Sequence, residues 1–298
     1  MMGAMSLTKF EAIDGYALID IDGATRAVGP VRRAKKVLQR TTEDLIRHAT
    51  YAAAFHNVAA SGGAVALNLD PAADDQSPLT NFVDEASAWA MTTGFIGTAL
   101  MGLGAEQGSV LTHESLHMSQ ELLAASAAAS AGSVADKNVA VVSEWDEAAL
   151  TTYLDKAADV SSYPLEDALQ SSADIVFVRG KTGVINHEVV AECNVGAIVG
   201  LQPLTTTARG LAVASRAGTV IVPDFISAAG PVLAALSSTA LSSTADATAL
   251  SAEVASMVTE AMTSVNRGTD LFVEACVAAE TFMRTWTDKL PFGRPLAP

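Results

Sequence analysis

The stretch that decides the fold is Asp174–Pro231, which reads DIVFVRGKTGVINHEVVAECNVGAIVGLQPLTTTARGLAVASRAGTVIVPDFISAAGP. It contains three short runs rich in Ile and Val, at Ile175–Val178, Ala197–Gly200 and Thr219–Val222. Two amphipathic segments, His187–Cys193 and Thr205–Arg216, separate these runs. Strands that are apolar throughout and alternate with helices are typical of a parallel sheet covered on both faces. The sequence therefore predicts an α/β protein.

The composition is that of a folded globular protein, since 50% of the 298 residues are hydrophobic and 17% are charged. The formal charge of −15 would repel a phosphate backbone, so we expect no nucleic-acid partner. No segment has the order of a signal peptide, and no apolar run reaches about 18 residues, so we expect no membrane partner. We interpret Cys193 and Cys276 as buried free thiols rather than a disulfide, which predicts a cytoplasmic protein.

The N-terminal part mixes strands and helices. Tyr16–Asp22 (YALIDID) alternates as a half-buried strand does. Thr42 is expected to cap a helix that runs to about His56. Ser61–Asp70 reads as a glycine turn leading into a strand, and Asn81–Met91 has helical spacing. Five basic residues lie between Arg26 and Lys36, and they indicate either a solvated turn with a helix start or a local anion site.

The order of elements and the VPDF…AAGP ending at Val222–Pro231 resemble the glutamate/leucine/phenylalanine/valine dehydrogenase family. The resemblance implies an α/β protein of two domains. Residues 1–111 would form an N-terminal α/β oligomerisation domain, and 112–245 a reduced Rossmann-like domain with a parallel sheet. Residues 246–298 would be C-terminal helices that return to the first domain. It further implies NAD(P) as cofactor, a small ligand in an interdomain cleft, and a homo-oligomer.

The positions that carry this family's chemistry are apolar in the chain. The resemblance places Ala52 and Ala64 where the family has two lysines, one for the substrate carboxylate and one for activating water. It places Ile96, in an expected turn at 93–98, where the family has a catalytic aspartate. Family asparagines are replaced by Pro203, Leu204 and Ala228. The leading hypothesis is therefore a homologue that no longer deaminates amino acids and serves in binding, assembly or an altered reaction.

One glycine-rich segment could hold a dinucleotide. GLGAEQG follows the apolar run Phe95–Met101 and offers Gly102, Gly104 and Gly108 with the spacing GxGxxxG. The pattern alone is weak, because an acidic partner for the ribose is expected about 20 residues later, whereas the next expected strand ends at Glu144, 40 residues after Gly104. The alternative is a glycine-rich connection between domains. The next expected strand, Asn138–Val142, is followed by SEWDEAAL without a glycine, and residues 139–177 leave room for one strand–helix unit.

Two further hypotheses stay open. The first is an NAD-dependent oxidoreductase of amino or oxo acids with rearranged groups, for which the basic candidates are Lys137, Lys156, Arg179 and Lys181. Arg179 and Lys181 directly follow an expected strand, where such folds place ligands.

The second is a metal-dependent enzyme. His113-Glu114-Ser115-Leu116-His117 matches H-E-x-x-H, which on a helix places two histidines on one face for zinc and a glutamate for water. Third ligands are candidates by type only: Glu121, Glu144 and Asp146. The alternative is an ordinary helix start with partly exposed histidines.

The C-terminal part is expected to be helical. A Ser/Thr/Ala-rich segment at 236–250 indicates a linker or an exposed helix. Apolar residues recur at helical spacing from Ser251 to Trp286, and Gly268 is expected to divide this segment into two helices.

Overall fold

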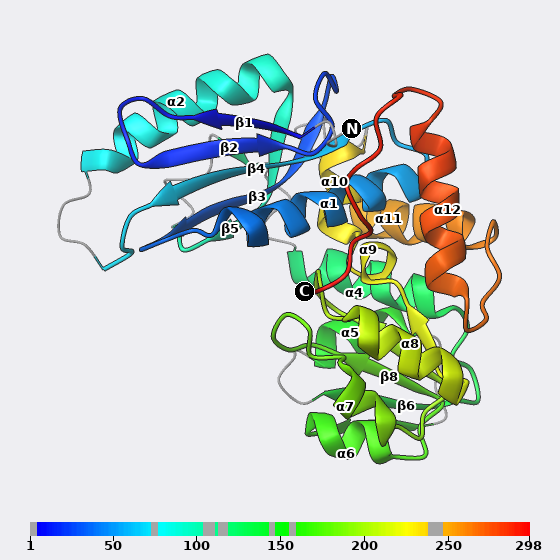
Figure 1. Cartoon of the computed structure of the whole chain (residues 1–298). Helices are drawn as coiled ribbons and strands as arrows, with labels where there is room; N and C mark the ends of the chain where they lie inside the picture. The colour runs from blue at the N-terminus through cyan, green and yellow to red at the C-terminus, as the bar shows by residue number, and fades with distance from the viewer. Residues whose placement is uncertain are drawn as a thin grey trace. The chain divides into compact units, whose positions relative to one another are not determined.

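The computed structural model describes residues 5–72, 77–103, 111–112, 119–142, 147–154, 159–237 and 247–298. The chain forms two compact units (Figure 1). Unit 1 comprises Met1–His117, Pro231–Ser243 and Glu280–Pro295. Unit 2 comprises Met118–Gly230, Thr244–Ala279 and Leu296–Pro298. No helix among the described residues is long and apolar enough to cross a membrane.

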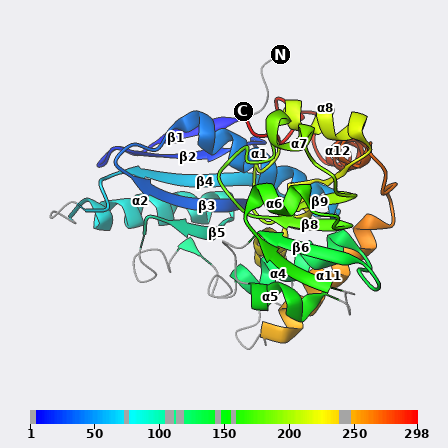
Figure 2. The ribbon, with the colours of Figure 1, turned by 90° about the horizontal axis from the view of Figure 1, so that it is seen from below.

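Unit 1 is built on a mixed sheet of five strands in the order β1-β2-β4-β3-β5 (Figure 2). The strands are β1 (Ser6–Lys9), β2 (Gly15–Ile19), β3 (Ala27–Ala34), β4 (Ser61–Asn68) and β5 (Phe95–Met101). β2 is antiparallel to both β1 and β4, whereas β3 is parallel to both β4 and β5. The strand predicted at 16–22 is thus found as β2.

Helices cover both faces of this sheet because successive side chains of a strand point to opposite sides. On one face Leu18 and Ala64 pack with Ile46 of α1 (Gln39–Phe55). On the other face Ile19 packs with Phe82 of α2 (Ser77–Thr93). Both helices predicted in this part of the chain are confirmed.

Three local predictions for unit 1 are wrong. Thr42 does not cap α1, since the helix begins at Gln39 and the Thr42 hydroxyl donates to the Leu38 carbonyl inside the first turn. The glycines of 61–63 do not form a turn but lie within β4. The basic segment 26–36 is neither a turn nor a helix start, because Ala27–Ala34 is the internal strand β3 with Val28 and Val31 fully buried. The strand was not predicted because Arg32 and Arg33 near its end interrupt the apolar pattern.

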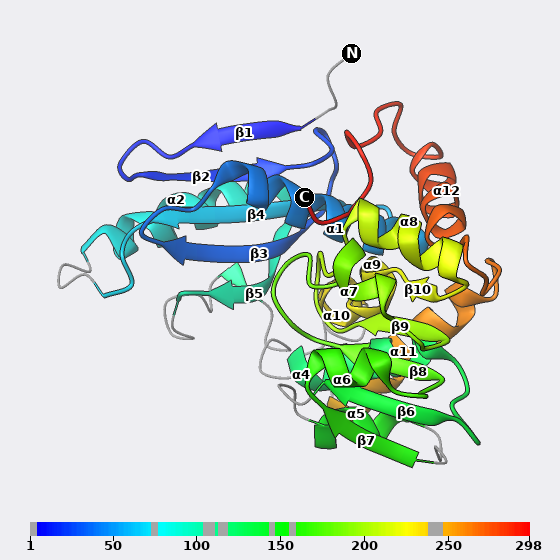
Figure 3. The ribbon, with the colours of Figure 1, turned by 60° about the horizontal axis from the view of Figure 1, so that its bottom comes forward.

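Unit 2 contains a five-stranded, fully parallel sheet in the order β10-β9-β8-β6-β7 (Figure 3). The strands are β6 (Asn138–Val142), β7 (Asp159–Tyr163), β8 (Ile175–Val178), β9 (Ala197–Gly200) and β10 (Val220–Val222). The predicted parallel sheet is confirmed. Between β6 and β8 the chain holds one further strand, β7, as the length of that interval predicts.

Helices connect these strands: α5 (Glu147–Tyr153), α6 (Leu165–Gln170), α7 (His187–Ala191) and α8 (Ala208–Ala217). α9 (Asp224–Ser227) follows the last strand, β10. Leu169, Val190 and Ala214 from α6, α7 and α8 form one core with Val176 and Ile198 of the strands. On α4 (Ser119–Ala131), the Ser126 hydroxyl donates to the Ser227 carbonyl of α9 at 2.7 Å. Unit 2 is therefore layered as the sequence predicts.

The C-terminal part divides between the units. α11 (Ala247–Met262) packs on α4 within unit 2 and does not join the first domain, because the small side chains of α4 let the two helices approach. α12 (Leu271–Met283) begins in unit 2, after a break that includes Gly268 as predicted. Residues 280–295 belong to unit 1, as does most of α10 (Gly230–Leu236). There Glu280 accepts a hydrogen bond from the Tyr51 hydroxyl and pairs with Arg294, each at 3.0 Å.

Candidate functional site

The strand order of unit 2 reverses between β6 and β8. From β6 the chain moves to the edge strand β7, then returns past β6 to β8 and continues to β9 and β10 on the other side. In open parallel sheets of this kind, ligands bind outside the carboxyl ends of the strands at this switch point. The connections that follow β6 and β8 are therefore the first place to look for a site.

The connection after β8 contributes Arg179, Gly180 and Lys181. Arg179 is half-buried and Lys181 is exposed. The Gly180 carbonyl accepts a hydrogen bond from the side chain of Gln202, which follows β9. This edge of the sheet thus holds two cations, as the sequence predicts. Lys137 precedes β6 and lies at the opposite, amino edge of the sheet, so it cannot join them.

The connections after β8 and β9 are joined directly by backbone hydrogen bonds. Gly183 N donates to Leu204 O at 2.8 Å, and Ile185 N donates to Thr205 O at 2.9 Å. Ala297, near the end of the chain, donates from its backbone N to Thr206 O at 2.9 Å. Because these polar groups satisfy one another, the two connections keep their shape without a ligand.

The VPDF segment has a structural role at this edge. The Asp224 carboxylate accepts hydrogen bonds from Thr205 N at 2.7 Å and from Thr205 Oγ1 at 2.9 Å. Asp224 is only 2% exposed, and it fixes the connection after β9 to the start of α9. Gly200 is required here, because a Cβ at this position would lie 2.4 Å from Thr205 Oγ1.

Leu204 adopts a left-handed backbone conformation with φ of 61°. A side chain with a Cβ loses roughly 1–2 kcal/mol in this conformation, and Gly, Asn or Asp is more usual there. Leu204 is buried, so apolar packing offsets this cost. The position is one where an asparagine would fit the backbone, although the chain has a leucine.

In unit 1 the paired glycines of β4 are explained by helix packing. A Cβ at Gly62 would lie 1.6 Å from the Ile46 carbonyl oxygen of α1, and one at Gly63 would lie 3.0 Å from the Ala27 Cβ. Gly62 therefore lets α1 lie close to the sheet, whereas Gly63 faces the other side, toward Ala27 and Phe95. Ala64, the next residue, is fully buried in the core between α1 and β4, and Ala52 of α1 is also fully buried.

A buried polar network lies beside these glycines. The Thr50 hydroxyl donates to Asp20 Oδ2 at 2.7 Å and accepts from Gly62 N at 2.8 Å. Burial raises the pKa of Asp20 to about 6, although the Thr50 hydrogen bond and the charge of Arg47 lower it. Asp20 is not among the site residues predicted from sequence. The feature that could have indicated it is an acidic residue next to an apolar strand pattern, YALID.

His56, at the C-terminal end of α1, is a second buried ionisable group. Its Nδ1 lies 2.7 Å from the Ala52 carbonyl oxygen. Burial lowers the pKa of His56 to about 4, while the bond to Ala52 raises it, so the ring is neutral at pH 7 and donates from Nδ1. His56 therefore acts as a cap of the helix.

Several solved structures have the same architecture as this chain. The chain resembles a hetero-hexameric glutamate dehydrogenase from Thermus thermophilus in its leucine-bound form, with a TM-score of 0.72, 14% identity, and coverage of 94% of this chain and 88% of that one. It also resembles L-tryptophan dehydrogenase from Nostoc punctiforme, with a TM-score of 0.71, 13% identity, and coverage of 95% and 96%. The fold is that of the amino-acid dehydrogenases. Glutamate dehydrogenase 2 of Plasmodium falciparum gives a TM-score of 0.70 at 12% identity, covering 95% of this chain and 85% of that chain.

The amino-acid dehydrogenase fold confirms the resemblance that the sequence shows. No family model matches the sequence, and no curated protein matches it. At these identities the likeness is one of fold.

A nicotinamide dinucleotide, which this fold implies, needs a glycine turn after β6 so that its pyrophosphate can approach the backbone closely. The sequence after β6 reads Ser143-Glu144-Trp145-Asp146, which contains no glycine, and these four residues, with the candidate ligands Glu144 and Asp146, lie outside the described ranges. About 20 residues later, where a carboxylate would bind the ribose, β7 ends at Tyr163 and Pro164 follows. No catalytic step is assigned to this cofactor.

The other predicted glycine loop has a different explanation. Gly102 ends β5 with φ of +78°, and a Cβ there would lie 2.1 Å from the Arg33 carbonyl oxygen, so backbone packing requires glycine. Gly104 and Gly108 lie outside the described residues, and so do His113, Glu114, His117 and Lys156. Glu121 is exposed on α4. Within the described ranges, no three His, Cys, Asp or Glu side chains are grouped to hold a metal ion.

The expected turn at 93–98 is not formed. Gly94, with φ of +60°, alone connects α2 to β5, and Phe95–Met101 is a strand. Ile96 therefore lies inside the sheet, paired with Val28 of β3, rather than in a turn.

Proposed function

We propose that this protein has the amino-acid dehydrogenase fold without nicotinamide-dependent deamination, and that it serves in binding or assembly. The observation that supports this most is the connection after β6. β6 ends at the switch point of the parallel sheet, and the four residues that follow it in sequence include Glu144 and Asp146 and no glycine. Two carboxylates that follow the strand would repel a pyrophosphate bound beside it.

The alanines at positions 52 and 64 support the same conclusion. Ala64 packs in an apolar core with Leu18 and Ile46, so an ammonium group there would be buried without a carboxylate partner. If these positions are those of the family's lysines, no cation stands there to receive a substrate carboxylate. Removing that carboxylate from water then costs several kcal/mol without return.

The test is a direct titration followed by an assay. NADH and NADPH are added to the protein while nicotinamide fluorescence is followed, and the protein is then assayed with NAD or NADP and a panel of L-amino acids. We expect no saturable binding and no reduced nicotinamide. An active amino-acid dehydrogenase assayed alongside is the control. Turnover at about 1 s⁻¹ or above, an ordinary enzyme rate, would overturn the proposal.

A second candidate is an oxidoreductase with a rearranged site. The half-buried Arg179 at the switch point favours it, because it could receive a carboxylate there. If it does, the assay above detects turnover with an amino or oxo acid, and Arg179→Ala raises KM for the acid while Lys181→Ala, which changes an exposed neighbour, has a smaller effect.

The H-E-x-x-H segment supports a third candidate, a metal-dependent enzyme using His113, Glu114 and His117. Elemental analysis of the purified protein tests it. About one zinc per chain, lost in His113→Ala and His117→Ala, would support this candidate, and a metal-free protein would dismiss it.

We also infer a homo-oligomer joined through the first domain. β1 is an edge strand of the unit 1 sheet and exposes Leu7, which is 41% accessible. An edge strand with an exposed apolar side chain favours pairing with a second chain. One of the structures with the same fold is hetero-hexameric, so assembly is compatible with it. Cys193, which is partly exposed, and the buried Cys276 form no disulfide within the described residues, which fits a cytoplasmic protein.

A further inference from the structure

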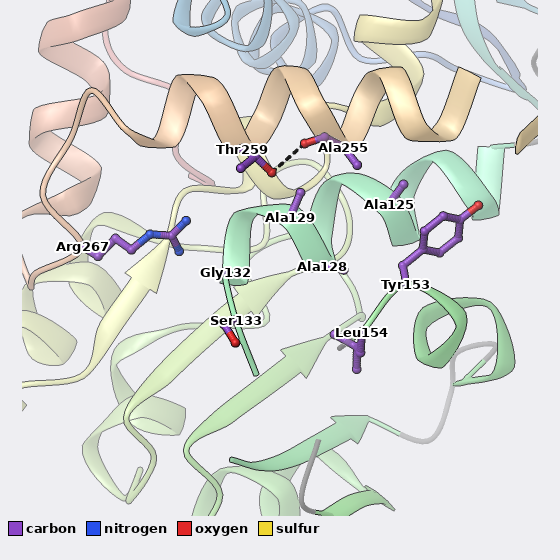
Figure 4. A pocket seen from close by; sticks show the side chains of 10 residues that line it. All are labelled: Ala125, Ala128, Ala129, Gly132, Ser133, Tyr153, Leu154, Ala255, Thr259 and Arg267. Carbon is purple, nitrogen blue, oxygen red and sulfur yellow. Dashed lines mark hydrogen bonds between the residues drawn. The ribbon is translucent and has the colours of Figure 1, made fainter. Parts of the chain in front are cut away.

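Unit 2 contains a cavity of about 320 Å³ away from the carboxyl edge of its sheet. The C-terminal half of α4 and one face of α11 form its long walls, and Tyr153 at the end of α5 and Leu154 after it close one side (Figure 4). The walls are small and apolar, since Ala125 and Ala129 of α4 face Ala255 of α11. A cavity of this size and character is at the lower end of the range for small-molecule sites.

A guanidinium group is fixed at one end of this cavity. Arg267 Nη1 donates to the Ser130 carbonyl oxygen at 2.7 Å, in the last turn of α4. Gly132 follows the helix with φ of +75°, and a Cβ there would lie 2.8 Å from Arg267 Nη1. The absence of a side chain at Gly132 thus lets the guanidinium lie against the end of the helix. A cation in this place is also favoured by the helix dipole.

Arg267 has hydrogen-bonding capacity that the fold does not use. A guanidinium carries five N–H donors, and one of them is bonded to Ser130. In the part of the chain that the structure describes, no carboxylate forms a salt bridge with Arg267. The nearby Glu274 is engaged elsewhere, since its Oε2 accepts from Asn266 N at 2.8 Å. Burial lowers the pKa of Arg267, but the group stays protonated at any ordinary pH.

The two ends of the cavity differ in chemistry. Arg267 lies beside Gly132, and the ring of Tyr153 lies toward Ala125 at the other end (Figure 4). Gly132, which follows α4, lies seven positions after Ala125, and seven positions correspond to about 10 Å along a helix. Between these ends the wall consists mainly of alanine side chains, together with Thr259 of α11, whose hydroxyl donates to the Ala255 carbonyl oxygen at 2.8 Å. The shape therefore suits an elongated molecule with one anionic end and one apolar end.

We propose that this cavity binds a small monocarboxylate with an apolar tail. The carboxylate would accept hydrogen bonds from the unused donors of Arg267, which suit its two oxygens as a pair. The tail would lie along the alanines of α4 and Ala255 toward Tyr153. In a chain with a formal charge of −15, an exposed arginine that is bonded to Ser130 and has no carboxylate partner among the described residues provides local attraction for an anion.

Titration calorimetry with sodium octanoate tests this site on the full chain. We expect saturable binding with one site per chain. Octanamide has the same tail without the charge, and acetate has the charge without the tail. Each should bind at least about tenfold more weakly than octanoate, because octanamide loses the paired, charged hydrogen bond and acetate loses the burial of the tail. Octanamide that binds as well as octanoate would overturn the role of Arg267.

Two variants separate the ligand site from the helix cap. Arg267→Lys keeps a cation at the end of α4 but not the paired donors, so octanoate should bind at least about tenfold more weakly while the melting temperature changes little. Ala129→Leu fills the cavity and should abolish binding with Arg267 intact. Ala255→Leu, on the half-exposed face of α11, fills it from the other wall if Ala129→Leu does not fold.

Arg216→Lys is the matched control. Like Arg267, Arg216 donates to a backbone carbonyl oxygen, that of Ala212 at 3.0 Å, but it lines no part of this cavity. It should leave octanoate binding unchanged. An absence of octanoate binding to the unaltered protein, or equal binding to all four variants, would overturn the proposal.

Discussion

Asp20 and His56 are two buried ionisable groups of unit 1. Asp20 contacts Thr50 of α1 and His56 ends that helix, and their titrations change the stability of the protein in opposite directions with pH. The pKa of Asp20 is raised to about 6 in the folded state by burial, against about 3.9 in an unfolded chain. Between these values the folded protein binds more protons, so its stability falls as pH rises from about 4 to about 6. The pKa of His56 is lowered to about 4 by burial, against about 6.5 unfolded. Its contribution to stability is therefore lost as pH falls from about 6.5 to about 4.

We predict that Asp20→Asn stabilises the protein at pH 7.5. The change removes a buried charge and keeps an oxygen for the Thr50 hydroxyl. A shift of about two pKa units corresponds to at most about 3 kcal/mol, which is the upper limit of the gain. Urea denaturation at pH 4.5, 5.5, 6.5 and 7.5 measures it. The variant's stability should rise with pH over this range, because the contribution of His56 is then unopposed, and a profile parallel to that of the unaltered protein would contradict the argument.

His56→Gln should show the reverse profile. Glutamine can still donate to the Ala52 carbonyl, so the cap of α1 is retained while the titrating ring is removed. With Asp20 unopposed, stability should fall as pH rises from about 4 to about 6. His187→Gln, which alters an exposed histidine of α7, is the control and should leave the profile unchanged. The idea fails if both histidine variants behave alike.

At the scale of the element, close packing of α1 on β4 depends on Gly62. We predict that Gly62→Ala destabilises the protein by several kcal/mol, because its Cβ would lie 1.6 Å from the Ile46 carbonyl oxygen and the helix would have to move. Gly268→Ala is the matched control, since nothing lies within 4 Å of a Cβ there. It should change stability by less than about 0.5 kcal/mol. Urea denaturation measures the stability of both variants. Equal effects would contradict the prediction and show that α1 can move to make room for the added Cβ at little cost.

The elements that sequence could predict are those with one dominant pattern. β8 and β9 are buried on both faces and read as continuous apolar runs. The length of the chain between β6 and β8 predicts one further strand, but the residues of β7 (DVSSY) could not be assigned, because an edge strand tolerates polar residues. β3 (AVGPVRRA) could not be predicted because it contains Gly29, Pro30 and two arginines. A shift of register between Gly29 and Pro30 accommodates the proline.

At the scale of the whole molecule, the sequence alone predicts that alanines occupy the family's two lysine positions and that no glycine follows β6. It does not predict what surrounds these positions in the fold. That Ala64 faces an apolar core, or that Gly102 is required by the Arg33 backbone, depends on contacts between residues far apart in the chain. The cavity beside Arg267 was missed for the same reason. Ser130, Gly132 and Arg267 are ordinary residues in sequence, and only the approach of the loop after α11 to the end of α4 brings them together.

The assembly of the molecule gives the last prediction. If chains pair through β1 of unit 1, Leu7→Lys should convert the dimer to a monomer, because a charge on an edge strand discourages pairing with a second strand. Light scattering at micromolar protein concentration measures the mass. Leu38→Lys is the matched control, since Leu38 is 57% exposed just before α1 and lies outside the sheet. The unaltered protein and Leu38→Lys should both show the dimer mass or a multiple of it. A monomer mass for the unaltered protein would exclude pairing altogether, and an unchanged mass for Leu7→Lys would place the contact elsewhere than at β1.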